Sequence, residues 1–151
     1  YRLVEALTPL QGLYDYCILD TPPALGVLTV NALAACNGVI IPAQADIYSL
    51  HGIAQLYDTL QTVKRYCNPA LEVMGIVLTR HNGRAILSRE VAEKIEQTAA
   101  QLDTRLYKST IRECIALREA QAVKQDIFTY APRSNAAEDY MELVNEIIGE
   151  A

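Results

Sequence analysis

One carboxylate in this chain stands where magnesium chemistry is common. Asp20 directly follows the apolar run 16–19 and precedes Thr21, Pro22 and Pro23. A carboxylate at the end of a buried strand loses hydration and therefore needs a partner. A magnesium-bound water is one such partner, as in the acidic motif of nucleotide hydrolases that hold phosphates in a loop. From position alone, a carboxylate that only caps the turn before Pro22 is an equally open interpretation.

Other candidate residues follow other expected strands. Ligands of open parallel sheets bind beyond the carboxyl ends of the strands. We therefore expect one edge of the sheet to be lined by Asp20, Pro42, Thr79, Arg80 and residues 110–112.

A third candidate is a stretch of positive charge. Residues 80–118 contain eight basic and five acidic side chains, whereas the whole chain carries a net charge of −5. The total argues against a uniformly basic nucleic-acid binder, but a local positive field can still attract an anionic partner. The alternative is a solvated helix face with pairs such as Glu90 and Lys94, four residues apart.

The elements that would position these residues alternate between strands and helices. Strands are expected over residues 16–19, 39–41 (stopped by Pro42), 73–79 and 106–111. Helices are expected near the start (Leu3, Leu7, Leu10), over 27–36 and 47–66, from a cap at Ser88 to 102, and over 113–123. This alternation predicts an α/β fold with a mostly parallel sheet, helices on both faces, and a single domain over 1–151.

The last expected helix has the clearest signals. Asn135 and Glu138 form a candidate capping pair, and Gly149 follows the end. Its inward face is expected to consist of Ala137, Tyr140, Met141, Val144 and Ile148.

Composition excludes several classes of protein. The 151 residues are 51% hydrophobic and 21% charged, a globular balance rather than a disordered one. The four cysteines form no C-x-x-C pair and neither histidine is near one, which argues against zinc and fits a reducing cytosol. The uncharged run 21–45 is interrupted by three prolines and two glycines. A membrane helix with those breaks would leave backbone groups unpaired.

Several blocks of sequence, in this order, resemble the ParA/Soj family of partition ATPases. The resemblance covers essentially the whole chain. The blocks are residues 14–23 (YDYCILDTPP), 31–33, 39–44 (VIIPAQ), 48–52, 75–80 (GIVLTR), 87–91, 110–112, 119–120 and 130–140 (YAPRSNAAEDY).

The resemblance implies a deviant phosphate-loop (SIMIBI-like) ATPase of the bacterial cytoplasm and nucleoid. Such a protein would dimerise on ATP, bind nonspecific DNA, and position chromosomes or plasmids with a ParB-type centromere-binding partner. By this carry-over, Asp20 acts on Mg²⁺ through a water, and Thr21 and Pro22 belong to the switch segment that responds to the γ-phosphate. The residues that would flank the adenine are Thr79, Arg80, His81, Thr110 and Ile111.

The same resemblance bears on the positive stretch. It places Arg84 on the DNA-contacting surface, and the residues that could extend that surface are Arg105, Lys108, Arg112 and Arg118. The family pattern often has a further arginine where this chain has Ala116. Phosphate contacts need charge more than fixed geometry, so Arg118 could substitute in part.

One departure from the family is large. The Lys-Gly-Gly-x-Gly-Lys-Thr loop that cradles the phosphates does not occur in these residues. We therefore expect the C-terminal portion of a longer ATPase, inactive alone, with sheet edges that another copy could cover. A non-catalytic DNA-binding or dimerisation module without the loop remains an alternative. A MinD-like membrane protein is disfavoured, because such a protein would end in a basic amphipathic helix, whereas residues 146–151 of this sequence are acidic.

Overall fold

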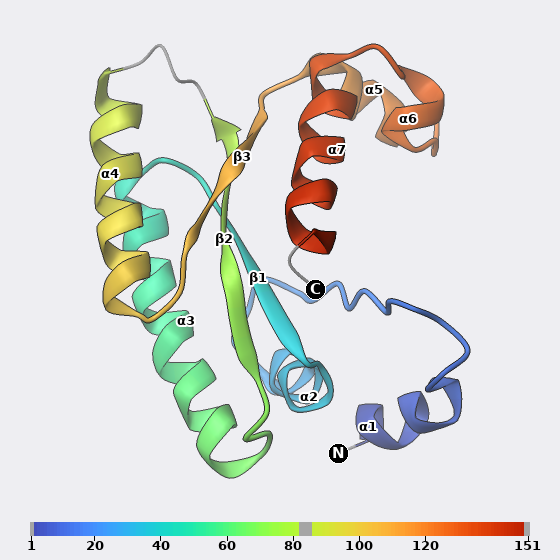
Figure 1. The fold of residues 1–151 in the computed structure, drawn as a ribbon, viewed down its shortest axis with the longest axis vertical. Coiled ribbons are helices and arrows are strands. Elements are labelled where there is room, and N and C mark those ends of the chain that lie inside the picture. The colour runs from blue at the N-terminus through green and yellow to red at the C-terminus, as the bar shows by residue number, and fades with distance from the viewer. Residues whose placement is uncertain (1, 82–85, 150–151) are drawn as a thin grey trace. The chain divides into compact units, whose positions relative to one another are not determined.

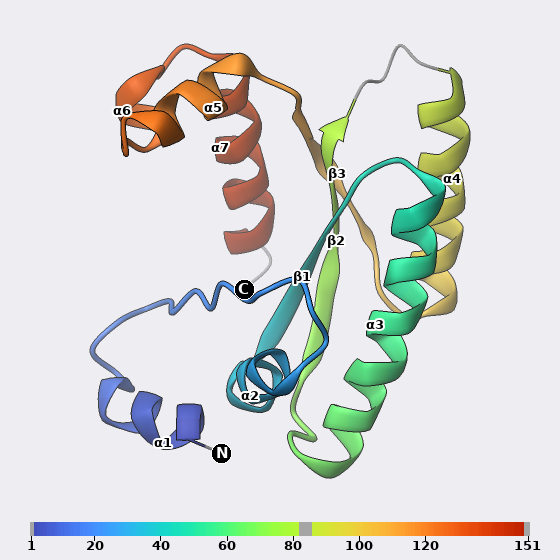
Figure 2. The same ribbon diagram turned by 180° about the vertical axis from the view of Figure 1, so that it is seen from behind.

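The structure is a computed structural model that describes residues 2–81 and 86–149, with only the backbone described for 86–89. Its elements are α1 (Arg2–Leu7), the 3-10 helix η1 (Thr8–Leu10), α2 (Val27–Ala35), β1 (Gly38–Ala43), α3 (Ile47–Tyr66), β2 (Glu72–His81), α4 (Ile86–Gln101), β3 (Leu106–Arg112), α5 (Ile115–Ala122), α6 (Ile127–Tyr130) and α7 (Asn135–Ile148) (Figures 1 and 2). The strands form one sheet in the order β1-β2-β3, and β2 and β3 run parallel. The predicted α/β class is confirmed.

The chain forms two compact units, both of which contain part of the sheet. The first comprises residues 1–39 and 51–74, and the second comprises residues 40–50 and 75–151. In the first unit, the Asn68 side-chain amide donates to the backbone oxygens of Leu33 (3.1 Å) and Cys36 (2.7 Å). The backbone N–H of Glu72 donates to the oxygen of Asn37. These bonds join the end of α2 to the turn between α3 and β2.

The strand expected over residues 16–19 is not formed. These residues are irregular, and the side chains of Tyr16 and Ile18 are 60% and 92% exposed. A strand exists only where a neighbour pairs with its backbone, and none does so among the described residues. Pro42 lies inside β1 instead of ending it. Because β1 is an edge strand of the described sheet, the missing N–H of Pro42 is tolerated there.

Helices α4 and α7 lie on opposite sides of β3 in the second unit (Figures 1 and 2). Residues Val91, Ile95 and Ala99 of α4 are buried. The core on the other side contains Val77, Tyr107, Ile111 and Leu143.

Two expected caps are wrong. Ser88 already lies within α4, which includes Ile86. Ser134, rather than Asn135, caps α7, because the Ser134 hydroxyl accepts the N–H of Ala137 at 3.2 Å. The expected inward face of α7 is also partly wrong. Met141, Val144 and Ile148 are 47%, 38% and 49% exposed, whereas Ala136, Asp139 and Leu143 are buried.

The pairing of β2 with β3 is irregular in two places. Between the pairs Ile76–Leu106 and Leu78–Thr110, β3 has two extra residues. Residues in such irregularities lose their ladder hydrogen bonds. The Glu146 carboxylate of α7 accepts the backbone N–H groups of Lys108 and Ser109, both at 2.9 Å, and the Ser109 hydroxyl. A side chain therefore replaces the strand neighbour at this point.

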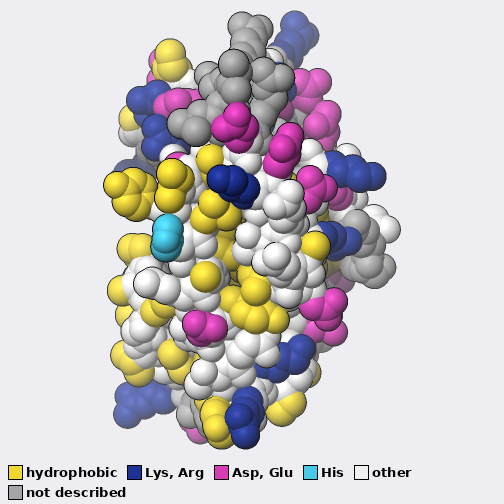
Figure 3. Space-filling view, turned by 90° about the vertical axis from the view of Figure 1, so that its left-hand side faces the viewer, with side chains coloured by type: hydrophobic (Ala, Val, Ile, Leu, Met, Phe, Trp, Pro, Cys, Tyr) yellow, Lys and Arg dark blue, Asp and Glu magenta, His cyan; other side chains and the backbone are white. Residues whose placement is uncertain are grey.

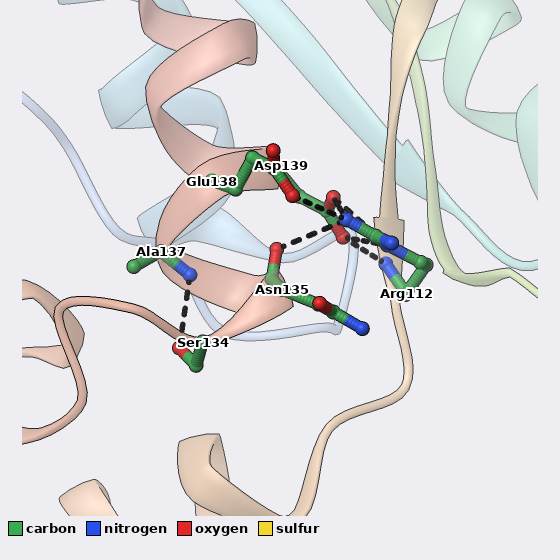
Figure 4. A network of polar contacts seen from close by, with 6 residues as sticks. All are labelled: Arg112, Ser134, Asn135, Ala137, Glu138 and Asp139. Atoms are coloured by element: carbon green, nitrogen blue, oxygen red, sulfur yellow. Dashed lines mark hydrogen bonds and ion pairs between the residues drawn. The ribbon is translucent and has the colours of Figure 1, made fainter.

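A second carboxylate of α7 closes the end of β3 (Figure 4). Asp139, only 3% exposed, accepts the Arg112 backbone N–H (2.9 Å) and the Arg112 Nε–H (2.9 Å to Oδ1), and Nη2 donates to it as well. Arg112 Nη2 also lies 3.2 Å from Glu138 Oε2. We call the contacts of Asp139 and Glu146 with β3 the β3–α7 clasp.

The clasp shifts the acidity of both carboxyls. Burial alone would raise the pKa of Asp139, but the hydrogen bonds and charge of Arg112 outweigh it and hold that pKa below its usual value. Burial would likewise raise the pKa of Glu146, but the hydrogen bonds from Ser109 and Lys108 outweigh this effect and lower that pKa below its usual value. Both groups are therefore charged in the folded chain at neutral pH.

Arg112→Met is expected to destabilise the chain strongly. The substitution keeps the side-chain length but leaves the buried Asp139 charge with a single backbone donor. Although the Arg112 side chain is 44% exposed, the Asp139 side chain is only 4% exposed, and leaving that carboxylate without its counter-charge should lower the Tm by on the order of 10 °C. The matched control is Arg118→Met, which removes an ion pair with 70% and 52% exposed partners and should leave the Tm nearly unchanged. Equal Tm values for the two variants would contradict a structural role for the clasp.

The deficit of Arg112→Met should also depend on pH. A carboxyl whose folded pKa is lowered, as that of Asp139 is, stabilises the fold fully above its unfolded pKa of about 4, and this contribution is lost as the pH falls from there through the folded pKa. The wild type therefore loses the Asp139 contribution in acid. Melting curves at pH 7 and pH 3 should show the Tm difference between wild type and variant shrinking at the lower pH.

Gly75→Ala tests the close packing of β2 on β3. A Cβ at Gly75 would lie 2.6 Å from Cε2 of the buried Tyr107 ring, so the ring must shift. Overpacking of this kind costs about 1–3 kcal/mol of unfolding free energy, measurable by urea denaturation. In a Tyr107→Leu background the cost of Gly75→Ala should largely disappear.

Gly52→Ala is the control for this pair. Gly52 lies inside α3, and a Cβ there would meet nothing within 4 Å. Replacing a helical glycine by alanine should raise the unfolding free energy by about 0.5–1 kcal/mol. A Gly75→Ala variant as stable as Gly52→Ala would show that the Tyr107 ring is not fixed against β2.

Candidate functional site

The carboxyl ends of β2 and β3 form the candidate site in the second unit. Their parallel register places Thr79 beside Ile111 and His81 beside Arg112. Ile111 is buried, Thr79 and Thr110 are half-buried, and the Thr79 hydroxyl donates to the Ala43 oxygen at the end of β1 (3.3 Å). The five residues expected to flank an adenine (Thr79, Arg80, His81, Thr110 and Ile111) thus lie along one edge of the sheet. Their role in base binding stays a prediction.

Arg80 occupies the second irregularity of the sheet. It is the extra residue between the pairs Thr79–Ile111 and His81–Arg112, and its φ is +50°. A left-handed conformation is unfavourable for a side chain of this size and is often found at functional sites. The bend directs the guanidinium to Glu113, with Nη2 lying 3.3 Å from Oε1.

Arg118 contacts the same oxygen of Glu113, also at 3.3 Å. The side chains of Arg80, Glu113 and Arg118 are 61%, 52% and 70% exposed. We call these three residues the strand-end arginine cluster. Two guanidinium groups share one carboxylate, so the cluster has a net positive charge open to solvent. Guanidinium groups in this setting are suited to phosphate oxygens.

The other expected DNA-contacting residues are not gathered with this cluster. Arg112 is directed to α7 by the β3–α7 clasp. Lys108 is exposed on β3, and the Arg105 guanidinium lies 5.0 Å from the centre of the Tyr107 ring. Arg84 lies outside the described residues. Of the described residues that were expected to contact DNA, only Arg118 lies in the strand-end arginine cluster.

The mixture of charges on the face that carries α4 counts against one broad basic patch there (Figure 3). Figure 3 shows basic and acidic side chains interspersed with apolar ones on that face. Glu90 and Lys94 of α4 are both exposed. Among the described side chains of α4, Lys94 is outnumbered by Glu90, Glu93 and Glu96, whereas the strand-end arginine cluster has a net positive charge.

Asp20, Thr21 and Pro22 lie in an exposed irregular segment of the first unit. Thr29 of α2 anchors the segment that follows, because its hydroxyl donates to the oxygens of Ala24 (2.7 Å) and Pro22 (3.4 Å). Thr29 is 6% exposed. The turn after Asp20 is thus fixed by a buried hydroxyl, although Asp20 itself does not end a strand.

The residues fit a magnesium contact only in part. Within residues 2–81 and 86–149, no group of three or more His, Cys, Asp or Glu side chains could hold a metal ion. Mg²⁺ is commonly held by one or two carboxylates together with waters and substrate phosphates. The single exposed carboxylate of Asp20 fits a water-mediated contact of that kind, but the sequence has no glycine-rich loop to hold the phosphates.

The sequence left three residues of this region without a role. Glu113 directly follows β3 and joins two arginines, and the signal for it was a carboxylate at a strand end. Asp139 could have been found as a charge on the buried face of α7. Thr29 offered no sequence signal, because a threonine inside a helix is common.

Among the described helices, none is long and apolar enough to cross a membrane.

Comparison with known proteins identifies relatives. A family model described as an AAA domain matches residues 1–73. The sporulation initiation inhibitor protein Soj of Bacillus subtilis is 38% identical over 97% of this chain and 56% of its own length. The chromosome partitioning protein ParA of Myxococcus xanthus is 36% identical over 98% of this chain and 51% of its own length. The chain spans about half the length of these curated relatives.

Two solved structures share the fold. A protein from Mycobacterium smegmatis described as cobyrinic acid a,c-diamide synthase, with bound ADP and magnesium, is 32% identical, with a TM-score of 0.67 over 88% of this chain and 55% of that chain. The cell division ATPase MinD of Pyrococcus furiosus matches 99% of this chain and 58% of its own with a TM-score of 0.79, and at 23% identity it supports the fold alone. The sequence relatives show that the chain is similar to ParA/Soj partition proteins over nearly its whole length, and the solved structures show that it shares their fold.

Proposed function

We propose that the chain is part of a ParA/Soj-type ATPase that partitions chromosomes or plasmids. The observation that carries this is the 38% identity to Soj over 97% of the chain. The polar side chains at the carboxyl ends of β2 and β3 lie along one edge of the sheet and support it, because ligands of parallel sheets bind at this edge. The relative from Myxococcus xanthus, which is 36% identical, is described as a chromosome partitioning protein.

In this proposal the chain supplies part of a nucleotide site. Asp20 would hold magnesium through a water, Thr21 and Pro22 would respond to the γ-phosphate, and the edge from Thr79 to Ile111 would face the base. When bound, the metal would offset charge on the phosphates. The phosphate cradle would come from residues outside these 151. ATP would then drive dimerisation, and a ParB-type protein would be the partner.

One prediction of this proposal concerns ATP turnover. The 151-residue chain alone should show no magnesium-dependent ATP hydrolysis, because it lacks the amides and lysines of a phosphate loop. In the longer parent protein, Asp20→Ala should abolish magnesium-dependent turnover. A coupled assay for released phosphate measures both. Turnover by the isolated chain would refute the missing-cradle proposal. A parent whose turnover is unaffected by Asp20→Ala would refute the role of Asp20, and a parent without any turnover would favour a non-catalytic DNA-binding module.

Another prediction of this proposal concerns DNA. We propose that the strand-end arginine cluster contributes phosphate contacts in nonspecific binding, together with Arg84. Each lost contact lowers the slope of log K against log salt by about 0.9. Arg118→Ala in the ATP-bound parent should therefore weaken binding to random-sequence duplex and reduce the slope by about that amount, as should Arg80→Asn, since asparagine tolerates the left-handed conformation.

The control for the DNA test is Lys64→Ala, which removes an exposed cation of α3 outside the cluster. Fluorescence anisotropy at several salt concentrations gives the slopes. Arg112 is unsuitable for this test because its guanidinium is part of the β3–α7 clasp. Identical slopes for wild type, Arg118→Ala and Arg80→Asn would remove the cluster from the DNA interface.

A further inference from the structure

A surface hollow of about 450 Å³ lies beside α7, on a side of the helix different from the one that packs on β3. Its lining comes from α6, the loop after it and the first three turns of α7. The lining residues are Phe128, Pro132, Arg133, Ser134, Ala137, Glu138, Met141, Glu142 and Asn145. We call this the α6–α7 hollow.

The α6–α7 hollow continues into an apolar stripe along α7. Met141, Val144 and Ile148 are spaced by three and four residues and therefore share a helix face. They are 47%, 38% and 49% exposed, and Phe128 at the other side of the hollow is 41% exposed. The contacts of α7 with β3 are made by a different set that includes Asp139, Leu143 and Glu146. Packing within the described chain thus does not account for this second apolar face.

The charges around the α6–α7 hollow are mainly negative. Glu138 and Glu142 line it along α7, and Arg133 is the one cation in its lining. Residues 119–151 contain seven acidic and two basic side chains. Glu138 is 3.2 Å from Arg112, whereas no ion pair of Glu142 is found within the described part of the chain. The apolar face is therefore bordered by carboxylates that a cationic occupant would complement.

We propose that the α6–α7 hollow docks a short amphipathic segment of a partner protein, with lysine or arginine next to its apolar residues. An amphipathic helix laid in an apolar groove is a recurrent mode of peptide recognition. A second copy of this chain is a poorer occupant, because a symmetric contact between two hollows would oppose Glu138 and Glu142 to their own equivalents. The inference does not depend on the proposed ATPase function.

A peptide pair tests the inference on the full chain. The probe is an acetylated, amidated 14-residue helix of leucine, alanine and lysine with its leucines on one face, and its twin has glutamate at every lysine position. In ¹H–¹⁵N NMR titrations, the lysine peptide should shift signals of α6 and α7 and bind at least about tenfold more tightly than the twin.

Three variants locate the binding. Met141→Glu should weaken the lysine peptide at least about tenfold by placing a charge in the apolar floor. Glu142→Lys should lower the preference for the lysine peptide over its glutamate twin. Val123→Glu, at a 54% exposed apolar residue outside the hollow, should change neither. All three positions are exposed, and unchanged circular dichroism would show that the variants are folded.

Other outcomes would overturn the inference. These are no binding of the lysine peptide, equal affinity for both peptides, shifts confined to other elements, or a Met141→Glu variant that binds as well as wild type. Concentration-dependent dimers in sedimentation that Met141→Glu abolishes would assign the α6–α7 hollow to a second copy instead of a basic partner segment.

Discussion

The requirement that backbone N–H groups without a partner in the sheet find other acceptors organises the second unit. The register of β2 and β3 shifts twice within a few residues, and each shift removes regular ladder partners from part of the sheet. Carboxylates of α7 supply acceptors for β3, Glu146 at Lys108 and Ser109 and Asp139 at Arg112. The two acids are seven residues apart, so they lie two turns apart on one helix face. Helix α7 therefore does for β3 what a further strand would do.

This arrangement decides which arginines can meet a ligand. Asp139 is buried and needs a counter-charge, and Arg112 provides it at the end of β3. Arg112 is then committed to the fold. The bend at Arg80 turns the next guanidinium along the edge toward Glu113, where Arg118 joins it. Glu113 neutralises only one of the two, which leaves positive charge at the edge where ligands of parallel sheets bind. At the irregularity around Arg80, one arginine, Arg112, is thus bound within the fold, whereas Arg80 and Arg118 stay accessible to a ligand.

Periodicity predicted most of the elements because their local patterns agree with their final environment. The stretch 47–66 has helical spacing and forms α3 with those bounds, and the continuous apolar run of residues 73–79 lies within β2. The sequence-based predictions were wrong where the formation of a strand depends on pairing with a neighbouring strand. Residues 16–19 have the composition of a strand, but a strand also needs a neighbour. Pro42 could have ended a central strand, yet an edge strand accepts it. The cap of α7 was displaced by one residue, since serine and asparagine are equally suited to that position.

The grouping of the residues that follow β2 and β3 was predictable, but the position of Asp20 and the partners of the arginines were not. That the ends of β2 and β3 share an edge follows from parallel pairing alone, so Thr79, Arg80, Thr110 and Ile111 could be grouped from the sequence. The partners of Arg112 and Arg118 could not, because they depend on the register shift at Arg80 and on the face that α7 presents. An inward face that included Met141 and Val144 assumed a single apolar side. The structure gives α7 two: the side with Asp139 and Leu143 is buried against β3, and the side with Met141 and Val144 is exposed. A helical apolar pattern does not distinguish the side that packs within the chain from the side that does not, whereas the buried pair of Asp139 with Arg112 does.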